Sequence, residues 1–235
     1  MRTALLLLLI FFSRAWSLAA PKEAKISGTT PLFSISGNAD LTSHFVHRGL
    51  SYSDNNPALN AEFLLHMGSQ FKLGIWGSNI SNVNNPDDNF WFKFVGEIRV
   101  DLNAMNQLDF FVYDNRFYKA EGRNGQNMGF RLNVLKKFYG EADFGTNFEG
   151  SQTSYEYFSF GYIHAFNPVL KAKGQVGYTH QRMQGIYDYL DFRAEGLYEP
   201  YKHFSFYLGT SFPSQMGQFN DRSKSFIFGG VRFDY

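Results

Sequence analysis

The chain ends on the stretch Ser225-Phe-Ile-Phe-Gly-Gly-Val-Arg-Phe-Asp-Tyr235, in which two kinds of residue alternate. An extended strand places every second side chain on the same face. One face of this stretch would carry Ile227, Gly229, Val231, Phe233 and Tyr235. The other face would carry Gly230, Arg232 and Asp234. The sequence therefore predicts a strand that lies between an apolar and a polar environment.

The same alternation recurs upstream with charges that would share one interior. In residues 90–102, Phe90, Phe92 and Phe94 alternate with Trp91 and Lys93, and the pattern continues with further charges to Asp101. In water, such an exposed aromatic row promotes aggregation, which counts against the alternative of a soluble secreted β-sandwich. In lipid, an apolar outside and a polar inside are the requirements of a transmembrane β-barrel. We therefore expect an all-β fold, a single antiparallel transmembrane barrel.

The first residues are typical of a secretory signal peptide. Arg2 precedes the apolar run 4–12, and Ser17-Leu18-Ala19 is a small-x-small cleavage site. The run is about half of the ~20 residues that a spanning helix needs. We expect a signal peptide at 1–19, a flexible lead-in at 20–31 and the barrel at 32–235. No comparable apolar run follows Ala19, which argues against a helical membrane protein.

Composition limits the classes of partner. The chain has 22 Lys+Arg and 21 Asp+Glu, and removal of Arg2 and Arg14 with the signal leaves 20 against 21, a formal charge of −1. A nearly neutral chain has no general electrostatic attraction to nucleic acid. The chain has 0 Cys, so pairing and packing rather than disulfides must hold the exported protein together.

Turn-forming residues divide the chain into about twelve strand candidates, an even number. Most are near or above the ~9–11 residues that a tilted strand needs to cross a bilayer. Short connections alternate with longer ones rich in Asn, Gly, Ser and Gln, which predicts short periplasmic turns and longer outer loops. The expected strands are 33–50, 58–67, 71–80, 90–102, 107–118, 127–135, 138–148, 155–166, 169–180, 187–198, 203–212 and 224–235.

The polar face of these strands would line the lumen with nearly balanced charge. Two functions remain open: a narrow, water-filled pore for small hydrophilic solutes or ions, and a structural or adhesion barrel with a salt-bridged, plugged lumen. We favour the pore. The candidate pore-lining residues are Arg48, Glu62, Lys72, Trp76, Lys93, Glu97, Arg99, Asp101, Arg131, Glu141, Asp143, Lys171, Lys173, Asp191, Arg193, Glu195 and Arg232.

One motif lies in Ser43-His-Phe-Val-His-Arg-Gly-Leu-Ser-Tyr-Ser-Asp-Asn-Asn-Pro-Ala58 and is followed by Gly74-Ile75-Trp76-Gly77-Ser78-Asn79. It resembles the signature of the TorF-type porins, a bacterial family of unknown function also called Gcw_chp. The resemblance extends over essentially the whole mature chain and implies an outer-membrane pore without naming a solute. We expect Arg48 to lie near the outer mouth and pair with Glu62 or a neighbouring carboxylate, with Pro57 ending the first outer loop.

The chain's end also resembles the terminal assembly signal of outer-membrane proteins of Gram-negative bacteria. Ile227, Val231, Phe233 and Tyr235 would form this signal on the lipid face. The expected partners are outer-membrane lipid and lipopolysaccharide, the barrel-assembly machinery and small hydrophilic solutes. The expected location is the outer membrane.

The sequence gives little support for catalysis. His203 and Ser205 would share one strand face, as a Ser–His dyad requires, but no third group is placed beside them, so a lipid-modifying hydrolase is the least favoured reading. His44 and His47 would point to opposite faces of a strand. The run 82–89 has oxygen ligands suitable for Ca²⁺, but also the composition of an ordinary loop. We expect no enzyme activity, no cofactor and no metal.

Overall fold

The structure is a computed structural model that describes residues 32–81, 88–182 and 184–235. The predicted signal peptide (1–19) and lead-in (20–31), and most of the run 82–89, lie outside these residues. In the described part, no helix is long and apolar enough to cross a membrane.

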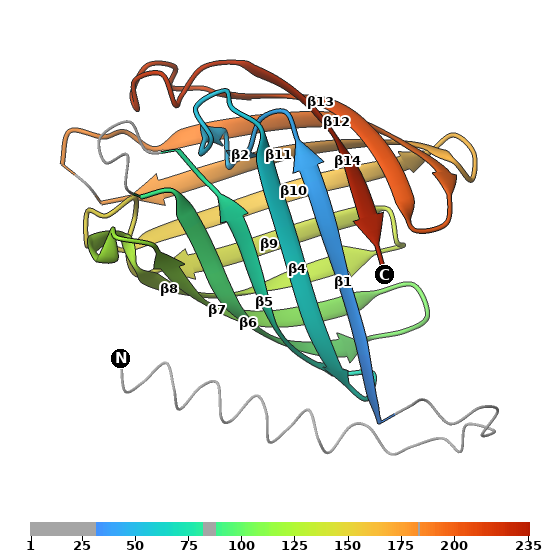
Figure 1. Cartoon of the computed structure of the whole chain (residues 1–235). Coiled ribbons are helices and arrows are strands. Elements are labelled where there is room, and N and C mark those ends of the chain that lie inside the picture. Colours follow the sequence, from blue (N-terminus) through green and yellow to red (C-terminus); the bar gives the residue numbers. More distant parts are fainter. Residues whose placement is uncertain (1–31, 82–87, 183) are drawn as a thin grey trace, which may run out of the picture. The chain divides into compact units, whose positions relative to one another are not determined.

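Twelve antiparallel strands of the described chain close into a barrel (Figure 1). Each strand pairs with its neighbours in sequence, and β1 closes the barrel by pairing with both β4 and β14. The barrel strands are β1 (Phe33–Thr42), β4 (Ala58–Met67), β5 (Phe71–Asn79), β6 (Phe90–Asp101), β7 (Gln107–Phe117), β8 (Gly125–Val134), β9 (Phe138–Gly145), β10 (Tyr155–Ala165), β11 (Leu170–Gln181), β12 (Tyr189–Tyr201), β13 (Phe204–Pro213) and β14 (Phe226–Asp234).

Alternation along each strand explains the closure. Large apolar side chains such as Phe63, Phe94 and Ile227 are exposed on the outer face, while their neighbours along the chain point into the barrel. This outer surface is suited to lipid, and closure pairs the two end strands, β1 and β14, over residues 38–42 and 230–234. The fold is therefore that of an outer-membrane β-barrel, as the sequence predicted.

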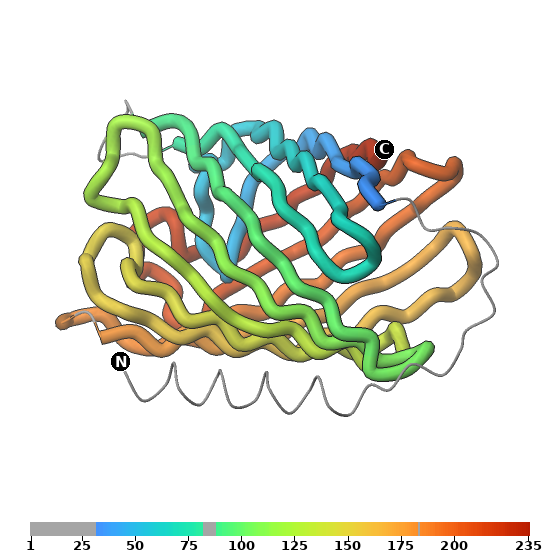
Figure 2. The backbone as a smooth tube through the Cα atoms, turned by 90° about the horizontal axis from the view of Figure 1, so that it is seen from below, coloured from blue at the N-terminus to red at the C-terminus, as the bar shows by residue number. Residues whose placement is uncertain are grey.

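Connections at the two ends of the barrel differ in length. At one end, short turns follow β4, β6, β8, β10 and β12. At the other end, longer loops follow β5, β7, β9, β11 and β13. Figure 2 shows the strands running obliquely between these ends. Transmembrane barrels place the short turns in the periplasm and the long loops outside, which gives the orientation used below.

The predicted first strand, 33–50, is wrong at its C-terminal half. β1 ends at Thr42, and the chain then turns into the barrel as far as Ser53, so that only Asn55, Asn56 and Pro57 of the expected outer loop are exposed. We call residues 43–57 the inturned segment. It contains a small hairpin of β2 (Val46–His47) and β3 (Leu50–Ser51), in which His47 pairs with Leu50.

Local geometry explains this departure. Arg48 and Gly49 form the two-residue turn of the hairpin with φ values of 51° and 74°. Two successive positive φ angles are the requirement of a tight type I′ turn, which reverses a strand within two residues. The side chains of Val46 and Leu50 are almost fully buried. A chain that reverses at residue 48 cannot continue as a membrane-spanning strand.

Candidate functional site

The lumen is the largest candidate site, and the barrel register determines which side chains enter it. β1 pairs Asp40 with Arg232 of β14 and with Asn60 of β4, all on the inner face. Following this register around the barrel places sixteen of the predicted residues on the inward row of their strands. These are Glu62, Lys72, Trp76, Lys93, Glu97, Arg99, Asp101, Arg131, Glu141, Asp143, Lys171, Lys173, Asp191, Arg193, Glu195 and Arg232.

Two of the predicted residues occupy unexpected positions. Asp101 is exposed at the short-turn rim. Arg48 lies at the tip of the inturned hairpin rather than on the wall, and it pairs with Asp143 of β9 instead of Glu62. Glu62 accepts a hydrogen bond from Asn38 Nδ2 at 3.0 Å. Of the expected partners, Glu62 or a neighbouring carboxylate, Arg48 therefore has a carboxylate other than Glu62, because the reversal at residue 48 directs the guanidinium to a different wall.

Most inward charges are paired with an opposite charge. Arg131 Nη2 lies 2.6 Å from Glu141 Oε2 on the adjacent strand, and Arg99 Nε lies 3.2 Å from Asp109 Oδ1. Lys72 pairs with Glu97, Lys171 with Glu199, Arg193 with Glu195 and Arg232 with Asp40. Opposite charges on facing strand positions stabilise the wall and leave the lumen with little net charge.

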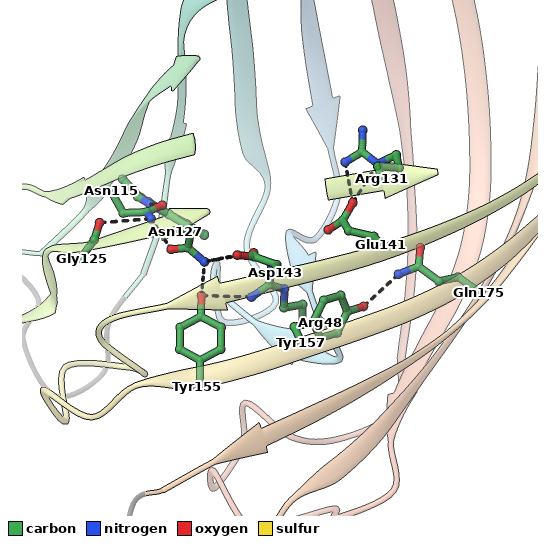
Figure 3. A network of polar contacts seen from close by, with 11 residues as sticks. Arg48, Asn115, Gly125, Asn127, Arg131, Glu141, Asp143, Tyr155, Tyr157 and Gln175 are labelled. Carbon is green, nitrogen blue, oxygen red and sulfur yellow. Dashed lines mark hydrogen bonds and ion pairs between the residues drawn. The ribbon is translucent and has the colours of Figure 1, made fainter. Parts of the chain in front are cut away.

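Arg48 joins the inturned segment to the far wall through a polar network (Figure 3). Its Nη1 donates to Tyr155 Oη at 3.0 Å, and its guanidinium carbon lies 4.1 Å from the ring centroid of Tyr157. Asn127 Nδ2 donates to Asp143 Oδ1 at 2.8 Å, which also fixes the carboxylate that receives Arg48. β8, β9 and β10 together therefore hold the tip of the hairpin.

Further contacts hold the body of the inturned segment in place. Arg193 Nη1 donates to the carbonyl of Val46 at 2.9 Å, and Arg222 Nε donates to the carbonyl of Ser51 at 2.9 Å. At Gly49 the chain passes so close to the wall that a Cβ atom would lie 2.8 Å from Cβ of Asp191. Only glycine combines this approach with the positive φ of the turn.

Above the hairpin, a charge network closes part of the long-loop end. Tyr52 Oη donates to Glu149, whose Oε2 lies 2.8 Å from Arg222 Nη1 and 3.4 Å from Arg123 Nη2. Burial alone would raise the pKa of the Glu149 carboxyl, but Arg222 and Arg123 outweigh it and lower the pKa to about 2. Glu149 is therefore a carboxylate at neutral pH and ties three loops together.

The inturned segment divides the lumen into compartments. One, of about 450 Å³, lies against β4 to β10 and is lined by Trp76, Trp91, Lys93 and Tyr113 among others. A second, of about 410 Å³, faces β8 to β12, and a third, of about 360 Å³, faces β1, β4, β13 and β14. His47 of the inturned segment borders all three.

Sequence reasoning missed the uncharged part of this lining. Tyr155 and Tyr157 lie on the inward row of β10 and contact Arg48, while Asn127 of β8 holds Asp143. Tyr139 Oη donates to Gln175 Oε1 at 2.8 Å. The sequence signal was present, because Tyr155 and Tyr157 alternate with Phe158 and Phe160, but apart from Trp76 the predicted lining consists of charged residues.

The remaining predicted residues belong to the terminal signal and to the histidine pairs. Ile227, Val231 and Phe233 lie on the outer face of β14, and the backbone of Tyr235 pairs with Gly37 of β1. His203 is exposed in the turn before β13, whereas Ser205 is buried on the inner face. His44 contacts Ser51 through Nε2 at 2.6 Å, but both side chains are buried in the fold of the inturned segment.

A family model described as a bacterial protein of unknown function, Gcw_chp, matches residues 25–215. The chain belongs to this family. The match includes the inturned segment and every barrel strand except β14. Comparison with curated proteins finds no significant match.

Among solved structures, the barrel is similar to two porins. The KdgM porin gives a TM-score of 0.58 at 9% identity, with 85% of this chain and 99% of that chain covered. The NanC porin gives a TM-score of 0.56 at 8% identity, with 85% and 99% covered. At such low identity the similarity concerns the fold alone, and it agrees with a twelve-stranded outer-membrane barrel.

Proposed function

We propose that this protein is a narrow porin of the outer membrane, which lets small hydrophilic solutes or ions pass by diffusion without a catalytic step. The same proposal includes the closer resemblance to TorF-type porins and the cleavage of residues 1–19 as a signal peptide. Its partners are then outer-membrane lipid and lipopolysaccharide, the barrel-assembly machinery and the solutes themselves.

The main support for a porin is that the polar inner face remains accessible on several sides of the inturned segment. The three compartments, of about 450, 410 and 360 Å³, are open spaces whose lining combines charged side chains with aromatic and other apolar ones. A barrel of structural purpose gains nothing from such polar space, whereas a pore requires it.

The fold similarity adds a point of comparison for the solute. The KdgM porin has been solved in complex with disordered oligogalacturonate, an acidic oligosaccharide. In the present lumen, acidic and basic side chains face each other in pairs such as Arg131 and Glu141. We therefore infer that passage here does not depend on a net excess of one charge sign.

A plugged structural barrel is the second candidate, and the inturned segment favours it. Arg48, Arg193 and Arg222 all anchor this segment, and Val46 and Leu50 pack it into the interior. A segment held at so many points could close the lumen permanently. The two candidates differ in one measurable property, the conductance of the folded barrel.

Reconstitution tests the proposal. Mature protein with heat-modifiable gel mobility, which reports a folded barrel, is inserted into planar bilayers and into liposomes. If the protein is a porin, we expect small, discrete conductance steps in KCl and swelling of the liposomes in a solution of a small sugar. A membrane that stays sealed at high protein loading contradicts the porin and supports the plugged barrel.

A further inference from the structure

Two inward charges in the largest compartment differ from the rest because they belong to no ion pair among the described residues. Arg48, Lys72, Arg123 and Arg131 each lie within 4.0 Å of a carboxylate. Lys93 instead lies over aromatic rings, with Nζ 4.6 Å from the ring centroid of Trp76 and 4.2 Å from that of Trp91.

The second such charge is the carboxylate of Glu62. It accepts a neutral hydrogen bond from Asn38 Nδ2 and has no basic partner within 4.0 Å in the described part of the chain. Uncompensated charges inside a protein are costly unless water or a ligand satisfies them. Both residues are half-buried, so an unpaired carboxylate and an unpaired ammonium that line one cavity indicate a place where a polar solute is received.

Strand register places the two charges in one row. Glu62 of β4 pairs with Trp76 of β5, and Trp76 pairs with Lys93 of β6. Glu62 and Lys93 are thus two strands apart, which corresponds to about 10 Å between backbones at about 4.8 Å per strand. Allowing about 3 Å for a hydrogen bond at each end leaves about 4 Å between the charges of a solute.

The same three residues lie where two compartments meet. Glu62, Trp76 and Lys93 line both the 450 Å³ and the 360 Å³ compartment. Phe45 of the inturned segment packs against Trp76 with ring centroids 5.8 Å apart, opposite the row. A solute that passes the inturned segment on this side therefore meets all three residues.

We propose that Glu62, Trp76 and Lys93 form a subsite for small zwitterions such as short amino acids. The ammonium group of the solute pairs with Glu62, its carboxylate pairs with Lys93, and its methylene groups lie along the indole of Trp76. This inference rests on the proposed porin function, because the solute must reach the lumen. It adds a class of solute to that function.

The test compares three solutes of equal carbon number: 3-aminopropanoate, propanoate and propylammonium. Binding to mature protein in detergent micelles is followed by the fluorescence of Trp76 and Trp91, and entry is followed in proteoliposomes. We expect the zwitterion to bind at least several-fold more tightly than either singly charged solute, and to enter faster. Equal binding of all three overturns the subsite, and this comparison needs no variant.

Substitutions of Glu62 and Lys93 test whether these residues cause the preference for the zwitterion. We expect Lys93→Gln and Glu62→Gln each to abolish the preference for 3-aminopropanoate, and the charge-exchanged pair Glu62→Lys/Lys93→Glu to restore it, because the solute can bind in the reverse direction. Lys137→Gln, in an exposed short turn, is the matched control and keeps the preference. Single variants that retain the preference, or an exchanged pair that does not restore it, contradict the assignment.

Failure of the subsite and failure of the porin give different results. Preferential binding in micelles without any passage through proteoliposomes contradicts the porin and leaves the subsite in place. Passage of all three solutes at equal rates, with no preference in binding, supports the porin and overturns the subsite.

Discussion

Arg48 is the residue through which the inturned segment is tied to the barrel wall. It pairs with Asp143, whose side chain is only 1% exposed, so loss of the guanidinium leaves a buried carboxylate without its main counter-charge. Removing one partner of a buried ion pair costs about 3–5 kcal/mol. The same contact holds the segment across the lumen.

We predict that Arg48→Gln lowers the temperature at which the heat-modifiable form is lost and raises the open conductance. Arg48→Gln/Asp143→Asn should recover part of the stability, since no charge is left buried, while the conductance stays high. Arg116→Gln is the control, because its exposed pair with Asp114 contributes about 0–1 kcal/mol. If Arg48→Gln has the same melting temperature and the same conductance as the wild type, Arg48 does not hold the inturned segment in place.

Glu149 makes the closure of the long-loop end dependent on pH. The pKa of its carboxyl is about 2 in the folded protein, against an ordinary value of 4.5. A lowered pKa means that the stabilisation is fully present above about pH 4.5 and is lost as the pH falls toward 2. The difference corresponds to a contribution on the order of 3 kcal/mol at neutral pH.

We therefore expect Glu149→Gln to loosen the loops at pH 7. Near pH 2 the variant and the wild type should be similar in stability, because the wild-type carboxyl is itself protonated there. Limited proteolysis of the outer loops in intact cells measures this at pH 7, and thermal unfolding in micelles measures it across the pH range. If the difference in unfolding temperature between the variant and the wild type stays constant from pH 7 to pH 2, the charge of Glu149 does not hold the loops.

At the scale of the strands, the alternation of apolar and polar residues was sufficient to predict most of the barrel. β6 was expected at 90–102 and is Phe90–Asp101, and the last strand was expected at 224–235 and is Phe226–Asp234. The pattern works because lipid outside and water inside impose opposite requirements on successive residues. Boundaries differ by a few residues because strand ends lie outside the hydrocarbon.

The inturned segment could not be predicted in the same way. The alternation of β1 is lost over residues 43–50, where Val46 and Leu50 share the phase of polar Asp40, but this loss alone does not show that Arg48 and Gly49 adopt positive φ angles. Its partners, Asp143, Arg193 and Arg222, are distant in sequence, so their contact with it depends on the closed barrel. For the same reason, the charges of the lumen were predicted as a set but not as pairs.

β14 must close the barrel against β1, and its outer face is the proposed assembly signal. We predict that deletion of Tyr235, or Phe233→Asp, sharply lowers the amount of folded protein in the outer membrane. An unpaired or polar closing strand is costly in hydrocarbon. Asp234→Asn changes the adjacent inner-face residue and should assemble normally. Normal yields of heat-modifiable protein for the truncated chain contradict the signal.

For the whole molecule, we expect the distribution of lumen charge to set the ion preference. Lys171, Lys173 and Arg193 are neighbours on β11 and β12, with Asp191 and Glu195 beside them. Replacing the three basic residues with Gln leaves the carboxylates and should shift the reversal potential in a KCl gradient toward cations. An unchanged reversal potential would mean that this wall does not face the conducting path.

The barrel is proposed to conduct, and the inturned segment to set the width of its pore. Single-channel recording of the wild type beside a variant in which residues 45–54 are replaced by a short Gly-Ser linker tests both parts directly. We expect small, discrete steps for the wild type and steps several-fold larger for the shortened variant, with both proteins heat-modifiable. A silent wild type, or equal conductance of the two folded barrels, would contradict this proposal.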